Sequence, residues 1–218
     1  EERFGVRLQN CYGSTESVCW VLTDLPFGER RWPSVGKPGL GYEVEIREEG
    51  RTLPAGEVGE IAVRGERGVA LMKGYYADAE ATARAVDADG WYLTGDKGYR
   101  DEDGWFYFVD RKSNMIKRAG ENISASEVED VLAGHPAVAE AAVIGVPDPV
   151  RGKAVKATIV LAEGFAGSSE LTRELQTWVK KRTAPYKYPR IIEFVDELPK
   201  TISGKIRRKA IRADDENR

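Results

Sequence analysis

Cysteine and histidine are scarce in this chain. Its 218 residues include two cysteines, Cys11 and Cys19, and a single histidine, His135. So few ligands, without metal-site spacing, argue against a disulfide scaffold and against a structural zinc site. We read both cysteines as inert, small apolar residues, and a reducing, cytoplasmic setting is expected.

Long apolar runs and a strong charge of one sign are also missing. No stretch approaches the ~20 apolar residues that span a bilayer, and no signal-peptide pattern is visible. The 33 basic residues nearly balance the 36 acidic ones, for a net charge of −3. We therefore expect neither a membrane span nor a nucleic-acid partner. Hydrophobic residues make up 41% and charged residues 32%, which is typical of a globular chain.

The first half of the chain reads as strands and turns. Residues 42–46 and 60–64 alternate between polar and apolar side chains, and 101–104 form a strong turn signal. One helix is expected over 78–86, with Asp78 as its N-cap. The many glycines between these segments favour hairpins or a small barrel.

The second half changes to capped helices and apolar strands. Ser124 with Glu127 forms a capping box, and Ser168 caps a later helix. Strands are expected over 141–146, 154–161 and 190–195. The order helix, strand, strand, helix, strand predicts a small α+β domain.

The sequence changes near residues 111–117 from strands and turns to capped helices and apolar strands, so we predict two domains. Residues 1–112 would form a strand-rich, barrel-like portion of a larger domain. Residues 113–218 would form a small, mobile α+β domain. The fold class expected for the whole chain is therefore α+β.

Four strings in a fixed order carry the functional signal. They are Asn10-Cys11-Tyr12-Gly13-Ser14-Thr15-Glu16, Tyr92-Leu93-Thr94-Gly95-Asp96, Val109-Asp110-Arg111 and Ser203-Gly204-Lys205-Ile206-Arg207-Arg208. Together they resemble the second half of an adenylate-forming acyl–coenzyme A ligase. Such an enzyme joins a carboxylic acid to AMP and then exchanges the AMP for coenzyme A. The Ser/Thr/Gly-rich loop that grips ATP phosphates in that family is not found here, and the chain starts at Glu1. We expect a C-terminal fragment that is inactive alone.

The resemblance implies roles for the first string. Thr15 would contact the α-phosphate, and Glu16 would help to hold Mg²⁺, which prefers oxygen ligands. Both are candidate catalytic residues. Tyr12 and Gly13 would line the adenine pocket. The alternative is a polar strand end followed by a glycine turn.

The resemblance also implies which residues bind the ribose of the nucleotide. Asp96 would accept hydrogen bonds from both ribose hydroxyls, since two adjacent hydroxyls suit the two oxygens of a carboxylate. Arg111 would reach the ribose or the phosphates. The alternatives are an ordinary Gly-Asp turn for Asp96 and a surface salt bridge for Arg111.

Lys205 is the third candidate catalytic residue. In related enzymes the matching lysine bridges the acid carboxylate and the α-phosphate, a role suited to a compact ammonium on a long stem. It lies in a loop made flexible by Gly204. The alternative reading stresses the run 200–212, which has six basic residues and no acid, and treats it as a non-catalytic site for polyanions.

The segment after Arg111 would supply a hinge and a second binding face. By position the hinge is Ser113, where many relatives carry Asp or Lys, and this departure puts the hinge chemistry in doubt. Lys117 and Gly120 match positions that contact the nucleotide or the pantetheine tunnel. A plain turn and strand is the alternative for Gly120.

Two further strings, 30–36 and 114–122, look like those of the crotonobetaine/carnitine–coenzyme A ligases. The implied cofactors are ATP/AMP, Mg²⁺ and coenzyme A, and the implied substrate is a small carboxylic acid. An adenylation domain that loads a carrier protein has the same fold and stays an alternative. The sequence does not indicate which acid is used or the oligomeric state.

Overall fold

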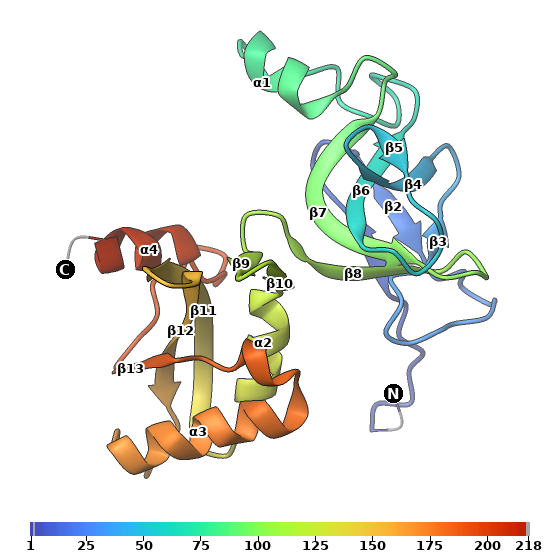
Figure 1. The fold of residues 1–218 in the computed structure, drawn as a ribbon. Coiled ribbons are helices and arrows are strands. Elements are labelled where there is room, and N and C mark those ends of the chain that lie inside the picture. The colour runs from blue at the N-terminus through green and yellow to red at the C-terminus, as the bar shows by residue number, and fades with distance from the viewer. Residues whose placement is uncertain (2, 217–218) are drawn as a thin grey trace. The chain divides into compact units, whose positions relative to one another are not determined.

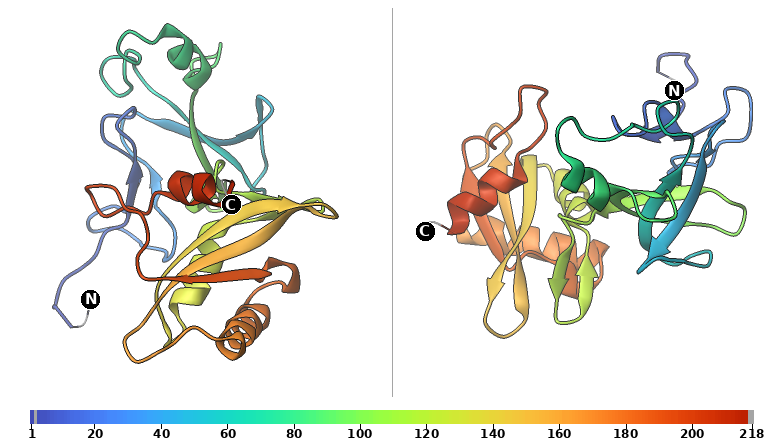
Figure 2. Two further views of the ribbon diagram at one scale, coloured as in Figure 1. Left: turned by 90° about the vertical axis from the view of Figure 1, so that its left-hand side faces the viewer. Right: turned by 90° about the horizontal axis from the view of Figure 1, so that it is seen from above.

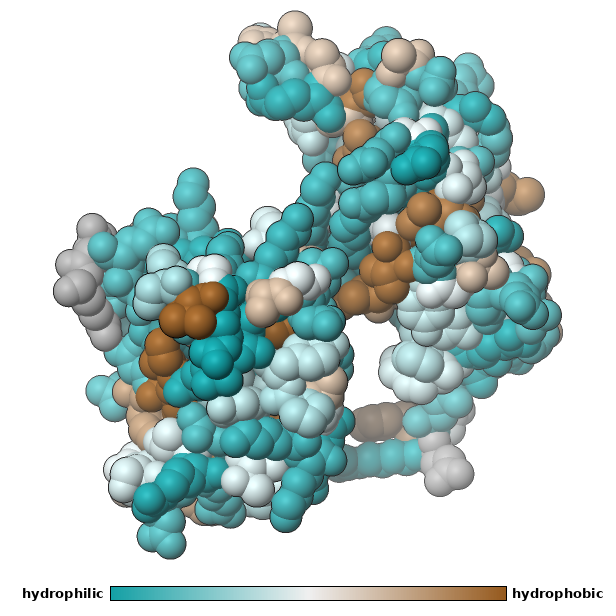
Figure 3. Space-filling view, in the orientation of Figure 1, coloured by the Kyte–Doolittle hydropathy of each residue, from teal (hydrophilic) through white to brown (hydrophobic). Residues whose placement is uncertain are grey.

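The computed structural model describes residue 1 and residues 3–216 (Figure 1). It divides the chain into two compact units, Glu1–Lys112 and Ser113–Arg218. Each unit has its own apolar core. On the face drawn in Figure 3, apolar side chains form scattered patches among mostly hydrophilic ones.

The described part of the first unit contains eight strands and one short helix. In chain order these are β1 (Cys11–Gly13), β2 (Trp20–Thr23), β3 (Lys37–Pro38), β4 (Glu43–Glu48), β5 (Arg51–Thr52), β6 (Gly59–Arg64), α1 (Ala79–Ala85), β7 (Tyr92–Arg100) and β8 (Phe106–Arg111). The expected strands over 42–46 and 60–64 are confirmed as β4 and β6. The helix α1 is confirmed as well, and the Asp78 side chain accepts a hydrogen bond from the Ala81 N–H at its start.

These strands form two open sheets. One has the order β1-β2-β3 and the other the order β5-β4-β6-β7-β8. The larger sheet does not close into a barrel within the described residues, since β5 and β8 remain its edges. Phe106 of β8 forms a bridge with Gly36, so this edge is joined to the segment that leads into β3. The strand-rich half is thus mixed α/β with bent, open sheets.

The described part of the second unit contains five strands, three α-helices and one 3₁₀-helix. In chain order these are β9 (Ile116–Arg118), β10 (Glu121–Ile123), α2 (Ala125–Ala133), β11 (Val138–Asp148), β12 (Gly152–Leu161), α3 (Ser169–Arg182), η1 (Pro185–Lys187), β13 (Ile191–Val195) and α4 (Arg208–Glu216). The predicted caps are confirmed, because Ser124 Oγ accepts from Glu127 N–H and Ser168 Oγ accepts from Leu171 N–H.

A three-stranded sheet, β11-β12-β13, separates two apolar layers in this unit. Alternate residues such as Val143 and Ala157 pack with α2 and α3 on one face. Their neighbours Ala142 and Ile144 pack with Ile211 of α4 on the other face (Figure 2, left). The alternation of side chains along β11 and β12 therefore lets both faces of the sheet be covered.

The helix α4 corrects the sequence reading. The sequence predicted no helix after 190–195 and treated 200–212 as a basic run, yet the last part of that run, from Arg208, is helical. Ile211 is the one buried residue of α4, and the helix has a strongly polar composition. Its polar and apolar residues nevertheless separate at helical spacing, so a helical pattern was present in the sequence and was missed. Packing of Ile211 against the sheet stabilises the helix.

Candidate functional site

Asp96 lies at the centre of the candidate site in the first unit. It is part of β7 and faces Arg111 of β8 in the strand register. The residue is only 7% exposed, and its Oδ2 accepts a hydrogen bond from the Tyr12 hydroxyl at 2.7 Å. Arg111 Nε lies 3.3 Å from Oδ1, but within the described residues this buried oxygen accepts no hydrogen bond. The carboxylate therefore keeps acceptor capacity for a ligand hydroxyl.

Burial sets the protonation behaviour of this pair. Burial raises the pKa of Asp96 above its ordinary value, and the Tyr12 hydrogen bond and Arg111 offset only part of that rise. Burial, and next the nearby Asp96 carboxylate, also raise the pKa of Tyr12 far above its ordinary value. The Tyr12 hydroxyl therefore stays protonated at neutral pH and acts as a hydrogen-bond donor.

The backbone around Asp96 is fixed from β6. The Gly95 N–H donates to Glu60 Oε1 at 2.9 Å, and Thr94 Oγ1 donates to the Ile61 carbonyl at 2.7 Å while accepting from the Asp96 N–H at 3.1 Å. Gly95 has φ +74°, which favours glycine. The sequence did not single out Glu60, because a glutamate in an alternating strand reads as solvent-facing; here it is 9% exposed.

Glu16 is surrounded by hydroxyl groups. The Tyr75 hydroxyl donates to Glu16 Oε1 at 2.8 Å. Partial burial raises the pKa of Glu16, but hydrogen bonds from its own N–H and from the Tyr75, Ser14 and Tyr92 side chains outweigh it and lower that pKa below its ordinary value. Glu16 is thus an ionised, pre-oriented carboxylate. Sequence reasoning missed Tyr75, which lies far along the chain, and named Tyr92 only as part of a flanking string.

The site offers a magnesium ion one carboxylate ligand, that of Glu16. No group of three or more His, Cys, Asp or Glu that could hold a metal occurs in the described part of the chain. Mg²⁺ commonly uses one or two carboxylates, with water and substrate phosphates as its remaining ligands. The ionised Glu16 fits that mode and does not fit an all-protein metal cage.

The connection between β1 and β2 is a constrained turn. A Cβ atom on Gly13 would lie 2.5 Å from the Cys19 carbonyl oxygen, so this position requires glycine. Val18 has φ +60°, a left-handed conformation that is unfavourable for a β-branched residue. Thr15 is exposed within the same turn. The turn thus holds Thr15 and Glu16 on a backbone with little freedom.

The cavity beyond this turn is a separate feature. Cys19 and Trp20 line a cavity of about 760 Å³ with mainly apolar neighbours, whereas neither Tyr12 nor Asp96 lines it. Trp20 is 63% exposed. The polar group around Asp96 and this apolar cavity are therefore distinct features of the first unit.

In the second unit, Lys117 is exposed on β9. Gly120 and Ala119 form the two-residue turn between β9 and β10, with φ +87° and +49°. Two positive φ values are typical of a type I′ turn, which favours glycine. No atom lies within 4 Å of a Cβ placed on Gly120, so the turn conformation alone accounts for this glycine.

Lys205 lies at the exposed tip of an ordered turn before α4. The Thr201 N–H donates to the Lys205 carbonyl at 2.8 Å, and the Lys205 N–H donates to Thr201 Oγ1 at 3.1 Å. Lys200 and Ile206 form a β-bridge below the tip. Gly204 has φ +80°, a left-handed conformation that favours glycine, so it shapes this turn. The expected flexible loop is therefore a small hairpin-like structure.

The structure brings only some predicted residues into contact. Tyr12, Asp96 and Arg111 meet directly, as described above. The predicted site residues of the first unit are Tyr12, Gly13, Thr15, Glu16, Asp96 and Arg111, and those of the second unit are Lys117, Gly120 and Lys205.

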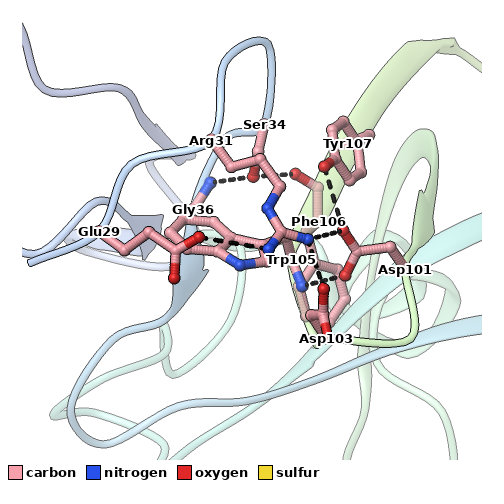
Figure 4. A network of polar contacts seen from close by, with 9 residues as sticks. All are labelled: Glu29, Arg31, Ser34, Gly36, Asp101, Asp103, Trp105, Phe106 and Tyr107. Carbon is pink, nitrogen blue, oxygen red and sulfur yellow. Dashed lines mark hydrogen bonds and ion pairs between the residues drawn. The ribbon is translucent and has the colours of Figure 1, made fainter.

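Residues 30–36 bind the turn before β8 and β8 itself (Figure 4). The Arg31 guanidinium binds Asp101 at 3.1 Å and Asp103 at 2.6 Å, both in the turn before β8. The Ser34 hydroxyl donates to the Phe106 carbonyl at 2.8 Å and accepts from the Gly36 N–H at 2.9 Å. This network fastens the segment to β8, the strand that ends at Arg111.

Two family models match the chain. The model described as AMP-binding enzyme matches residues 1–76, and the model described as AMP-binding enzyme C-terminal domain matches residues 127–205. This chain belongs to the AMP-binding, adenylate-forming enzymes. The family resemblance drawn from the sequence is confirmed by these matches.

Among curated AMP-binding enzymes, the chain is similar to crotonobetaine/carnitine–CoA ligases. It is 48% identical to that of Citrobacter koseri over 211 residues, which is 96% of this chain and 40% of the relative. It is 47% identical to that of Escherichia coli over 212 residues, which is 97% of this chain and again 40% of the relative. The chain thus spans about 40% of the length of these relatives.

Solved structures of AMP-binding enzymes share the fold. The o-succinylbenzoate CoA synthetase of Bacillus subtilis, in complex with its acyl-adenylate intermediate, matches with a TM-score of 0.84 and 37% identity, over 94% of this chain and 40% of that one. ATP-bound MatB of Rhodopseudomonas palustris matches with a TM-score of 0.85 and 29% identity, over 96% and 41%. The expected fold class is therefore confirmed.

Proposed function

We propose that this chain is the nucleotide-binding and lysine-bearing part of an AMP-forming acyl–CoA ligase. Such an enzyme activates a carboxylic acid with ATP and then transfers the acyl group to coenzyme A. The observation that carries the proposal is the buried Asp96, hydrogen-bonded by Tyr12 and beside Arg111, with one oxygen left for a ligand. Its membership in the AMP-binding family gives that geometry its meaning.

The first unit would hold the nucleotide. Asp96 would accept the ribose hydroxyls, with Tyr12 and Arg111 fixing its orientation, and Gly13 would let the backbone approach the base. Thr15, exposed in its turn, would donate to the α-phosphate. Glu16 would hold Mg²⁺, which when bound neutralises charge on the triphosphate.

The second unit would complete the two half-reactions. Lys205 would place a positive charge between the acid carboxylate and the α-phosphate, where negative charge develops. Lys117 and Gly120 would face the nucleotide or the pantetheine of coenzyme A in a second orientation of this unit. The unit would turn at Ser113 between the two steps.

The acid is proposed to be small and polar, of the crotonobetaine or carnitine type. Identity of 47–48% to ligases of that name supports this choice. The exposed, unpaired thiols of Cys11 and Cys19 suit the reducing, cytoplasmic setting that we propose. The polyanion-binding alternative is weakened, because Lys200 and Arg208 in the basic run are paired with Glu140 and Glu129.

The decisive experiment uses a hybrid enzyme in which this chain replaces the matching 40% of the E. coli ligase. We expect acid-dependent exchange of pyrophosphate into ATP, followed by thioester formation with coenzyme A. Lys205→Ala should slow adenylate formation ~100-fold, the loss typical of one preorganised charge contact. The thioester step from supplied acyl-adenylate should be unchanged.

An equal loss in both half-reactions would contradict the role of Lys205. Acyl transfer to a carrier protein but not to coenzyme A would favour the adenylation-domain alternative. A folded hybrid that neither exchanges pyrophosphate nor binds AMP would refute the proposed function.

A further inference from the structure

Glu129 on α2 joins three elements of the second unit. Its side chain is 12% exposed, and Oε1 accepts a hydrogen bond from the Val143 N–H of β11 at 2.7 Å. Arg208, the first residue of α4, binds the same carboxylate through two nitrogens, with Nε 2.9 Å from Oε1 and Nη2 against Oε2. Two parallel bonds of this kind fix direction as well as distance.

The position of Glu129 follows from the sheet order. Because β11 is an edge strand, its outward N–H groups need partners from outside the sheet. Glu129 serves Val143 in this way and also reaches Arg208, although α2 packs on one face of the sheet and α4 on the other. The glutamate therefore ties the start of α4 to the edge of the sheet.

The rest of α4 is anchored along one face. Arg208, Ile211 and Asp215 are spaced three and four residues apart, so they share one side of the helix. Ile211 is buried at 8% exposure, and Asp215 binds Lys156, which is 6% exposed on β12. Glu129 thus controls the end of α4 that adjoins the Lys205 turn.

Both apolar packing and charge hold the ends of the Lys205 turn. Leu198 before it is 4% exposed, and Ile206 after it packs against the apolar cluster that contains Ile211. The hydrogen bonds between Thr201 and Lys205 are local, so they set the shape of the turn but not its place on the unit. On the other side of the turn, Lys200 pairs with Glu140, but these side chains are 41% and 37% exposed. Exposed ion pairs contribute little. The pair of Glu129 and Arg208, whose side chains are 12% and 22% exposed, is the stronger of the two ion pairs.

We propose that Glu129 is a positioning residue for Lys205, acting through Arg208. The proposal rests on the proposed role of Lys205 in adenylate formation. The pair would hold the lysine turn in one place. This would reduce the conformational entropy that Lys205 loses when it binds the substrates.

The chain offers a matched control on the same helix. Glu127 lies two residues before Glu129 and pairs with Lys187 Nζ at 2.6 Å. Glu127→Gln and Glu129→Gln remove the same charge from α2 and break one ion pair each, but only Glu129 is linked to α4.

The first measurement is amide hydrogen exchange on the 218-residue chain. Glu129→Gln should speed exchange at the Thr201, Lys205 and Arg207 amides by about 10-fold, the change that corresponds to ~1.4 kcal/mol. Glu127→Gln should leave them unchanged. Arg208→Gln keeps the hydrogen bond between Glu129 and Val143, so α2 stays attached to β11. It should speed amide exchange at the turn as much as Glu129→Gln does. The double variant should exceed neither single variant by more than about twofold, since both act through one pair.

The second measurement uses the hybrid enzyme. Glu129→Gln should slow adenylate formation by about 10-fold and leave the thioester step from supplied adenylate unchanged, with Glu127→Gln at the wild-type rate. Equal exchange at the turn in both glutamine variants would overturn the proposal, as would equal loss of adenylation in both. If Lys205→Ala itself has no effect, the proposed function of Lys205 fails, while the exchange data still decide whether Glu129 positions the turn.

Discussion

Asp96 is a buried carboxylate whose surroundings favour its neutral form. Burial is the largest influence on its pKa and raises it, and Tyr12 and Arg111 do not fully compensate. A folded-state pKa above the unfolded value means that the folded chain binds the proton more readily. Stability from this group is therefore present at low pH and is lost as pH rises through the raised folded pKa.

Asp96→Asn should raise the stability of the fold while abolishing the binding of AMP. The amide oxygen can still accept from Tyr12, and no charge is left buried, so the free energy of unfolding at pH 7 should rise by on the order of 1 kcal/mol. At a pH below 3.8, which is under both the ordinary and the raised pKa, Asp96 itself is protonated and the gain should shrink. Binding of AMP should be lost. Thermal melts at both pH values and calorimetric titration with AMP test this, and a variant less stable than wild type at pH 7 would contradict it.

Val18 illustrates strain beside the candidate site. Its φ of +60° places a β-branched, 63% exposed side chain in the left-handed region. Asparagine tolerates that region, so Val18→Asn should raise the free energy of unfolding by about 1 kcal/mol. Val69→Asn is the control, since Val69 is similarly exposed at 66% and has no positive φ. Urea unfolding of both variants checks the prediction; equal effects would mean that the backbone at Val18 stores no strain.

At the scale of elements, Lys156 decides how α4 is held. It is buried on β12 and contacts Glu193 at 2.8 Å as well as Asp215. Burial alone lowers its pKa, but the hydrogen bonds to Asp215 and Glu193 outweigh this and raise the pKa above 10.5. Its contribution to stability is therefore complete below pH 10.5 and is lost as pH rises through the folded pKa.

Lys156→Met should destabilise the second unit by about 2 kcal/mol, because two carboxylates lose their partner. Helicity at 208–216 should fall before the sheet unfolds. Urea titrations followed by circular dichroism at pH 8 and at pH 11 test this. The difference between wild type and variant should be smaller at pH 11, and a difference that does not depend on pH would point to lost packing instead.

Sequence reasoning succeeded for elements with local signals. Asp78, Ser124 and Ser168 mark helix starts, and each makes the capping bond that its residue type predicts. It failed for α4, which buries only Ile211, and it considered a turn at Asp96, which lies within β7. At Asp96 the strand depends on a partner far along the chain, which no local pattern reveals, whereas α4 has a pattern at helical spacing that was missed.

At the scale of the whole molecule, the two compact units meet in sequence at Lys112 and Ser113. The Ser113 carbonyl accepts a hydrogen bond from Arg212 of α4 at 2.9 Å, so the first residue of the second unit is fastened to its own unit. We therefore propose the junction itself as the hinge. Motion between units joined by such a segment is the default expectation.

Ser113→Pro should restrict that junction, because proline fixes φ near −65° and removes an amide donor. In the hybrid enzyme we expect a slower thioester step, by about 10-fold or more, with adenylate formation largely intact. Single-turnover assays from supplied adenylate measure the rate of the thioester step. Pyrophosphate exchange measures the rate of adenylate formation. A melting curve equal to that of wild type is the control, and a normal thioester rate would refute the hinge at Ser113.

The sequence by itself determined the family and the capped helices. Each motif and each cap consists of residues close together in the chain, and the order of the motifs is read directly along it. The tertiary structure alone decided which side chains meet. Tyr12 and Asp96 are 84 positions apart, Glu16 and Tyr75 are 59 apart, and Glu129 and Arg208 are 79 apart. Contacts of this kind are fixed by strand register and by the packing of helices on sheets, and these arise only when distant segments bury their apolar faces together.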